Sequence, residues 1–122
     1  MSEPTTILYG IPNCDQVRKA RGWLSAHDVP YVFHDFKKDG IDRVMIAAWL
    51  VHQPWEELLN RRGATWRGLD EARKAGVVDG DSAAALMREN ASVVKRPVLV
   101  HDNAVHVGYS EKLYQELFAD EA

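Results

Sequence analysis

The stretch TILYGIPNCDQVRKARGWL, residues 6–24, combines a β-prone run, a tight loop and an amphipathic helical pattern. Thr6–Tyr9 is rich in β-prone side chains, and the loop Gly10–Asn13 that follows contains both glycine and proline. From Asp15 onward the apolar residues recur at helical spacing. The stretch therefore predicts a strand, a loop and a helix, with Cys14 at the junction of the loop and the helix.

Further strands are predicted on both sides of the chain's middle. Tyr31–Phe36 alternates aromatic and polar residues and predicts a second strand, reached by a βαβ crossover. Val98–His101 and Ala104–Val107 are β-prone runs joined by Asp102-Asn103, a pair suited to a tight hairpin turn. Ser110 caps a last amphipathic helix. The expected order is βαβ, then helices, then ββα.

The middle of the chain, about residues 41–91, is predicted to be helical. Helical patterns cover Ile41–His52, Trp55–Leu59, Arg67–Lys74 and Ser82–Glu89, the last with Asp81 as its cap. No linker, repeat or low-complexity stretch interrupts the 122 residues. We therefore expect one domain over residues 1–122, an α/β fold with a mixed four-stranded sheet and a helical insertion.

Composition narrows the possible functions. The formal net charge is −3, and the cations are scattered rather than gathered in a basic stripe, which argues against direct nucleic-acid binding. No run approaches the roughly 18 apolar residues of a membrane span, and the first residues do not have the pattern of a leader peptide. We expect a cytoplasmic protein with no membrane partner, and a monomer because no exposed apolar stripe is evident.

The cysteine and histidine content predicts no metal site. The single cysteine excludes an internal disulfide and a multi-cysteine zinc site, so any disulfide must involve another molecule. His34 and His52 have no ligand spacing. His101 and His106 flank the predicted hairpin turn, where exposed cross-strand histidines are the expected arrangement.

Cys14 is the residue best placed for chemistry. At the start of a helix its sulfur would face unpaired backbone N–H groups and the positive end of the helix dipole, which favour the thiolate over the thiol. Arg18 lies one helical turn further on, where a guanidinium could stabilise that charge. The alternatives are that Cys14 is a buried packing residue and that Arg18 is a solvated charge. Spacing alone does not decide between them.

Arg96 and Pro97 directly precede the third predicted strand. A proline there removes a backbone donor, so neighbouring carbonyl groups could meet an extended peptide or a thiol ligand. Only about 5–6% of X–Pro bonds are cis. The residues by themselves therefore favour an ordinary trans proline at this position.

Four segments together resemble the ArsC/Spx family, and most closely its YffB-like branch. They are YGIPNCDQVRKA (Tyr9–Ala20), LLNRRG (Leu58–Gly63), KRPVLV (Lys95–Val100) and VGYS (Val107–Ser110). The resemblance implies a thioredoxin-like fold with a helical insertion. It also implies that Cys14 is the nucleophile, that Arg18 lies beside it, and that Arg96 precedes a cis Pro97 facing the sulfur.

The sequence also departs from the family pattern. Arsenate reductases of the family have a histidine in the loop before the cysteine, and Gly10 stands at the matching position. Asn60, followed by Arg61 and Arg62, stands where one of their oxyanion-binding arginines is expected. The second cysteine of the Spx redox switch corresponds to Val17. These departures argue against efficient arsenate reduction and exclude an internal redox switch.

The resemblance leads to two expected functions. The first is a glutathione-dependent thiol oxidoreductase or reductase, arsenate reductase-like, that acts on a small-molecule or protein thiol or disulfide. Cys14 and Arg18 are expected to be catalytic, with no bound cofactor and with glutathione as co-substrate. Its expected substrate or glutathione contacts are Asn13, Asn60, Arg61, Arg62, Arg96 and Pro97. The second is an Spx-like regulatory or protein-binding module whose partner is RNA polymerase. A fold-only remnant without either activity is a third possibility.

Overall fold

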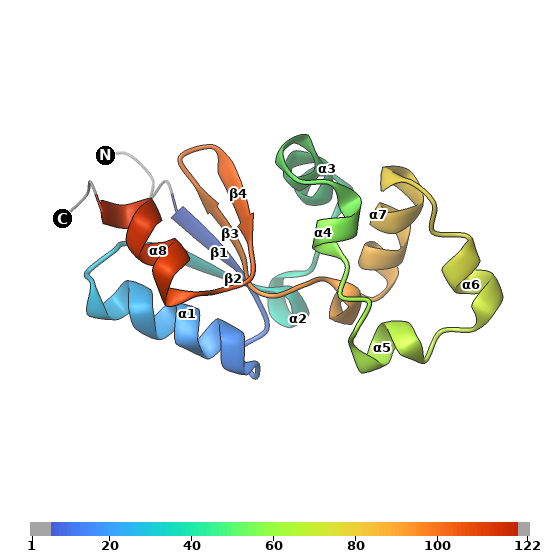
Figure 1. Cartoon of the computed structure of the whole chain (residues 1–122), viewed down its shortest axis with the longest axis horizontal. Helices are drawn as coiled ribbons and strands as arrows, with labels where there is room; N and C mark the ends of the chain where they lie inside the picture. Colours follow the sequence, from blue (N-terminus) through green and yellow to red (C-terminus); the bar gives the residue numbers. More distant parts are fainter. Residues whose placement is uncertain (1–5, 120–122) are drawn as a thin grey trace. The chain divides into compact units, whose positions relative to one another are not determined.

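The computed structural model describes residues 6–119, which form two compact units (Figure 1). Among these residues, the first unit contains 6–35 and 96–119. The second unit is Phe36–Lys95 and contains the whole predicted insertion. Each unit has its own set of packed elements.

The first unit is built on a four-stranded sheet. Its strands are β1 (Thr6–Gly10), β2 (Val32–Asp35), β3 (Val98–His101) and β4 (Ala104–Val107), in the order β2-β1-β3-β4 (Figure 1). β1 pairs with β2 in parallel and with β3 antiparallel, and β3 pairs antiparallel with β4. The predicted thioredoxin-like fold with a mixed four-stranded sheet is confirmed. β2 is shorter than the predicted strand, because Phe36 begins a short helix.

The hairpin between β3 and β4 follows the sequence prediction. Asp102 has φ 49° and Asn103 has φ 65°, so both central residues adopt the left-handed conformation. That pair of conformations defines the turn whose twist matches two adjacent antiparallel strands. Asp and Asn adopt it at lower cost than other non-glycine residues because their short polar side chains tolerate it.

The core of the first unit lies between the sheet and two helices. α1 (Asp15–Ala26) and α8 (Glu111–Phe118) cover the sheet face on which Leu8 and Leu99 lie directly opposite each other. The buried cluster consists of Leu8, Ala20, Trp23, Leu24, Leu99, Tyr114 and Phe118. Packing of α1 against this cluster fixes the direction of its first turn, where Cys14 lies.

Tyr114 is fully buried in this core, and its hydroxyl has no hydrogen-bond partner within residues 6–119. Burial raises the pKa of the Tyr114 phenol well above its ordinary value. An unsatisfied buried hydroxyl costs about 1–3 kcal/mol of folding free energy.

We therefore expect Tyr114→Phe to leave the free energy of unfolding in urea unchanged or to raise it by about 1 kcal/mol. The matched Tyr114→Ala protein should lose about 3–5 kcal/mol. A clear loss for Tyr114→Phe would contradict this reading.

The prediction that His101 is a surface residue is wrong. Its side chain is 5% exposed, its ring lies 4.4 Å from that of Phe118, and its Nδ1 is 2.7 Å from Thr6 Oγ1. The register places Thr6 directly opposite His101. The hydrogen bond supplies a polar partner inside the core, which makes the burial of the imidazole tolerable. The spacing of residues within β3 does not predict this cross-strand contact.

The second unit consists of short helices. They are α2 (Phe36–Asp39), α3 (Arg43–His52), α4 (Trp55–Leu58), α5 (Ala64–Arg67), α6 (Glu71–Ala75) and α7 (Gly80–Glu89), followed by the 3₁₀ turn η1 (Ala91–Val93) (Figure 1). The helical character predicted for this region is confirmed. Within residues 6–119, no helix is both long and apolar enough to cross a bilayer.

Two predicted helix boundaries in this unit are wrong. The single helix expected from Arg67 to Lys74 is two helices, because the Asp70 side chain accepts a hydrogen bond from the Arg73 backbone N–H at 2.7 Å and starts α6 anew. The cap of α7 is Asp79 rather than Asp81. Asp79 accepts from the Ser82 N–H at 2.9 Å, and the Ser82 hydroxyl reaches back to form a capping box.

The reason given for expecting a monomer does not hold in the structure. α3 carries an apolar stripe on its exposed side, where Val44 is 78% and Val51 is 77% exposed. Ala47 and Ala48, also exposed, lie between them at helical spacing. The helix therefore has apolar residues on its outer face as well as on the face that contains buried Ile46 and Trp49.

Candidate functional site

Cys14 lies at the predicted junction between the loop after β1 and helix α1. It is the N-cap residue of α1, with extended backbone angles of φ −144° and ψ 128°. Its carbonyl oxygen accepts the first helical hydrogen bond, from the Arg18 N–H at 2.9 Å. The side chain is partly buried and forms no disulfide. This placement brings the sulfur near the unpaired amides of the first helical turn.

The surroundings of Cys14 favour the thiolate. Burial by itself raises the pKa of the thiol, but hydrogen bonds from the Val17 backbone amide, the Arg96 side chain and the Gln16 backbone amide oppose it. The positive charge of Arg96 acts in the same direction as these hydrogen bonds. The net effect is a pKa below the ordinary value for cysteine. A low thiol pKa at a partly exposed position is typical of a reactive cysteine.

Arg18 is placed differently from what its spacing indicates. Its guanidinium forms an ion pair with Asp15 and donates a hydrogen bond to Asn13 Oδ1 at 3.3 Å. The side chain is 56% exposed. The groups that lower the pKa of Cys14 do not include it. Arg18 and Asn13 therefore lie together beside the cysteine loop, and a catalytic role for Arg18 stays a prediction.

Arg96 is the charged residue that reaches the sulfur. It directly follows the second unit and is joined to Pro97 by a cis peptide bond, as the family resemblance implies. The Pro97 carbonyl accepts a hydrogen bond from the Gly108 N–H at 2.8 Å, which ties the start of β3 to the segment after β4. The pairing of β1 with β3 brings the Arg96 segment beside the loop that leads to Cys14. This juxtaposition depends on residues more than 80 positions apart.

Gly10, the last residue of β1, leaves no space for a side chain. A Cβ atom at this position would lie 2.7 Å from Val17 Cγ2, a separation that real Cβ atoms essentially never show. Gly10 and Val17 are both buried. The chain therefore passes close against the first turn of α1, the same turn whose amides act on Cys14.

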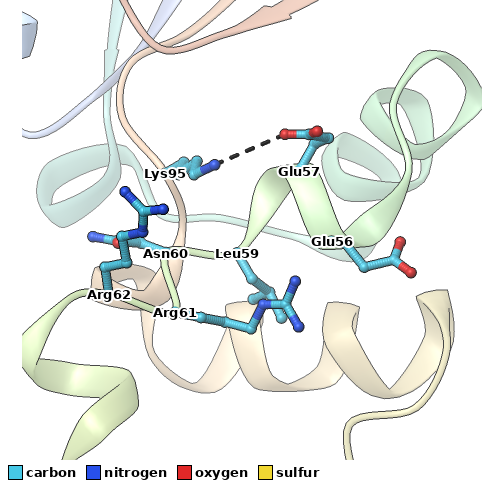
Figure 2. Close-up of a pocket in the computed structure, with 7 residues that line it drawn as sticks. All are labelled: Glu56, Glu57, Leu59, Asn60, Arg61, Arg62 and Lys95. Atoms are coloured by element: carbon cyan, nitrogen blue, oxygen red, sulfur yellow. Dashed lines mark ion pairs between the residues drawn. The ribbon is translucent and has the colours of Figure 1, made fainter.

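The other predicted contact residues gather in the second unit. Asn60, Arg61 and Arg62 line one pocket of about 370 Å³, shown in Figure 2. The remaining lining residues are Glu56, Glu57, Leu59 and Lys95. The sequence analysis missed the two glutamates and the lysine. An acidic pair beside two arginines was visible in the sequence, but the approach of Lys95 depends on long-range backbone pairing.

Among residues 6–119, no group of three or more His, Cys, Asp or Glu side chains is arranged to hold a metal ion. The second unit offers a charged pocket.

Comparisons with known proteins fit this arrangement. A YffB protein of solved structure is 45% identical, with a TM-score of 0.87 over 92% of this chain and 97% of that one. An arsenate reductase-related protein from Brucella melitensis is 43% identical, with a TM-score of 0.74 over 97% of this chain and 98% of that one. The global transcriptional regulator Spx of Listeria innocua is 28% identical over 85% of this chain and 79% of the regulator. The ArsC family model matches residues 9–117. The chain belongs to the ArsC family.

Proposed function

We propose that this protein is a glutathione-dependent thiol oxidoreductase whose nucleophile is Cys14. The observation that carries the proposal is the convergence of two backbone amides and the Arg96 guanidinium on one partly exposed sulfur. Together they lower the pKa of the thiol, so that more of the nucleophilic thiolate is present at neutral pH. The chemistry requires reduced glutathione, and we therefore place the protein in the cytoplasm.

The proposed reaction proceeds by two thiol–disulfide exchanges. The Cys14 thiolate attacks the glutathione sulfur of a mixed disulfide, the substrate S–S bond breaks, and the substrate leaves as a thiolate that takes up a proton. A second glutathione, as its thiolate, attacks the Cys14–glutathione disulfide, which releases oxidised glutathione and restores the Cys14 thiolate. The net reaction converts the mixed disulfide and one glutathione thiol into the substrate thiol and oxidised glutathione. A single cysteine suffices because glutathione resolves the intermediate.

Neighbouring residues have distinct proposed roles. Arg96 stabilises the Cys14 thiolate both before attack and when it leaves in the second exchange. Asn13 and Arg18, on the same loop and helix turn, contact the substrate or the peptide part of glutathione, and Pro97 borders the sulfur. Arginines suit this role because a guanidinium binds a carboxylate through two parallel hydrogen bonds. Asn60, Arg61 and Arg62 are the proposed contacts of the second unit with the substrate or with glutathione.

The pH dependence of alkylation tests whether Cys14 is activated. Because its pKa is lowered in the folded protein, the reaction with iodoacetamide should have its inflection at a lower pH than in the denatured protein. Below a pH of about 8.5 the folded protein should therefore react faster at equal accessibility. An inflection at or above that of the denatured control would contradict the proposed activation.

Two arginine variants distinguish which cation acts on the sulfur. Arg96→Met should shift the alkylation inflection upward, because it removes both a hydrogen bond and a positive charge from the thiolate. Arg18→Met should shift it much less, because Arg18 is paired with Asp15 and bonded to Asn13. The same pH titration measures both variants. An equal or larger shift for Arg18→Met would assign the stabilising role to Arg18 instead.

The Spx-like reading is the second candidate. It is supported by the 28% identity with the Listeria innocua regulator over most of both chains. In this reading the protein binds RNA polymerase, and Cys14 takes no part in catalysis. Copurification of this protein with RNA polymerase, unchanged by Cys14→Ser, would favour it over the oxidoreductase.

A further inference from the structure

The pocket in the second unit has a fixed backbone frame. Leu59 forms an isolated antiparallel bridge with Val94. On either side of it, the Asn60 N–H donates to the Val93 carbonyl at 2.7 Å and the Lys95 N–H donates to the Leu58 carbonyl at 2.8 Å. The Leu58, Leu59, Val93 and Val94 side chains are buried. The polar side chains around the pocket therefore extend from a segment anchored in the core of this unit.

Three charged side chains at this pocket have no ion pair within residues 6–119. They are Glu56, Arg61 and Arg62, all exposed. By contrast, Glu57 and Lys95 lie 3.8 Å apart and offset each other's charge. The Arg61 guanidinium lies 6.0 Å from the centre of the Trp55 ring, at the outer limit of cation–π attraction.

The available charges are of both signs. In Figure 2, Arg62 lies on the same side of the pocket as Asn60, whereas Arg61 extends toward the side where Glu56 lies. A simple anion would be attracted by the guanidinium groups but repelled by the Glu56 carboxylate. A simple cation would be attracted by the Glu56 carboxylate but would face the two guanidinium groups of Arg61 and Arg62. A ligand that carries one charge of each sign would satisfy both kinds of group.

We propose that this pocket binds a small zwitterion, a molecule with a carboxylate and an ammonium group a few atoms apart, as in an amino acid or the amino-acid end of a short peptide. The carboxylate contacts the Arg61 or Arg62 guanidinium, which is suited to bidentate binding. The ammonium contacts the Glu56 carboxylate. A volume of about 370 Å³ accommodates a ligand of this size.

This inference concerns the second unit alone and does not depend on the reactivity of Cys14. The γ-glutamyl end of glutathione carries a carboxylate and an ammonium on one carbon, so a thioether derivative of that peptide is a suitable probe. S-methylglutathione cannot form a disulfide with Cys14. A negative result with this probe therefore leaves the alkylation test of the proposed function untouched.

The test is a titration of the ¹⁵N-labelled full chain, followed by amide chemical shifts, with three probes. They are S-methylglutathione, its N-acetyl derivative, which lacks the ammonium, and inorganic phosphate. We expect S-methylglutathione to shift the amides of Glu56–Arg62 and Lys95, and the N-acetyl derivative to bind about tenfold more weakly, the loss of about 1.4 kcal/mol of one charged contact.

Variants identify the residue that recognises each charge. Glu56→Gln should weaken S-methylglutathione about tenfold without changing the affinity of the N-acetyl derivative. The double variant Arg61→Met/Arg62→Met should weaken both probes. Glu71→Gln is the matched control, an exposed glutamate of the same unit that does not line the pocket, and it should change neither affinity.

Two outcomes would overturn the proposal. If phosphate or the N-acetyl derivative shifts the same amides with equal or higher affinity, the pocket is an anion site and Glu56 has no recognition role. If S-methylglutathione produces no shifts at these amides at about 10 mM, a concentration tenfold above a dissociation constant of about 1 mM, the pocket binds no zwitterion of this class.

Discussion

Replacing Cys14 with serine is expected to abolish glutathione-dependent disulfide reduction. Serine lacks a sulfur that can form the mixed disulfide, and its hydroxyl is not ionised near neutral pH. Loss of the nucleophile from a covalent mechanism reduces the rate on the order of 10³-fold or more. The measurement is turnover of a glutathione mixed disulfide, with the oxidised glutathione recycled by a coupled reductase.

The same substitution should leave the fold intact. Cys14 is the N-cap residue of α1, and serine is among the residues most favoured at that position. The free energy of unfolding of Cys14→Ser should therefore be equal to that of the parent protein or slightly higher. Full reductase activity in a Cys14→Ser protein of normal stability would end the oxidoreductase proposal and direct attention to the binding module.

Trp49→Ala is expected to cause the largest loss of stability in the second unit. Trp49 is 1% exposed, and its ring lies 5.9 Å from that of Phe36. Truncating a fully buried tryptophan removes its contacts and leaves a cavity, which costs about 3–5 kcal/mol. Urea unfolding followed by circular dichroism measures the change, and a separate early transition would show that Phe36–Lys95 unfolds apart from the sheet unit.

A matched control lies on the same helix. Val44 is 78% exposed on the outer side of α3, so Val44→Ala removes little buried surface. Its effect on the free energy of unfolding should stay within about 0.5 kcal/mol. If Val44→Ala is as destabilising as Trp49→Ala, the outer face of α3 is covered in solution by another copy of the chain or by a partner.

Local sequence patterns predicted correctly those elements whose structure depends on residues close together in the chain. The hairpin at Asp102-Asn103 follows from residues that tolerate the left-handed conformation. The placement of Cys14 follows from a strand, a Gly/Pro loop and an amphipathic helix in succession. In both cases the determining interactions lie within a few residues of one another.

The features that the sequence did not predict depend either on competition between two possible helix caps or on contacts between residues far apart in the chain. Asp79 and Asp81 both suit a cap, and the capping box with Ser82 decides for Asp79. His101 is buried because it faces Thr6 across two strands 95 positions apart. Likewise, the groups that act on Cys14 include Arg96, which approaches only after β1 and β3 pair. Helical spacing indicated Arg18 instead as the residue that stabilises the Cys14 thiolate. Such spacing identifies only residues that are close in the sequence.

The close contact between Gly10 and Val17 means that the side chain at one position limits the size of the side chain at the other. A Cβ atom at position 10 would lie 2.7 Å from Val17 Cγ2, so a side chain at position 10 requires the Val17 side chain to shift or to become smaller. The positions of the two departures from the arsenate reductase and Spx patterns, the absent loop histidine and the absent second cysteine, therefore lie in direct contact in this fold.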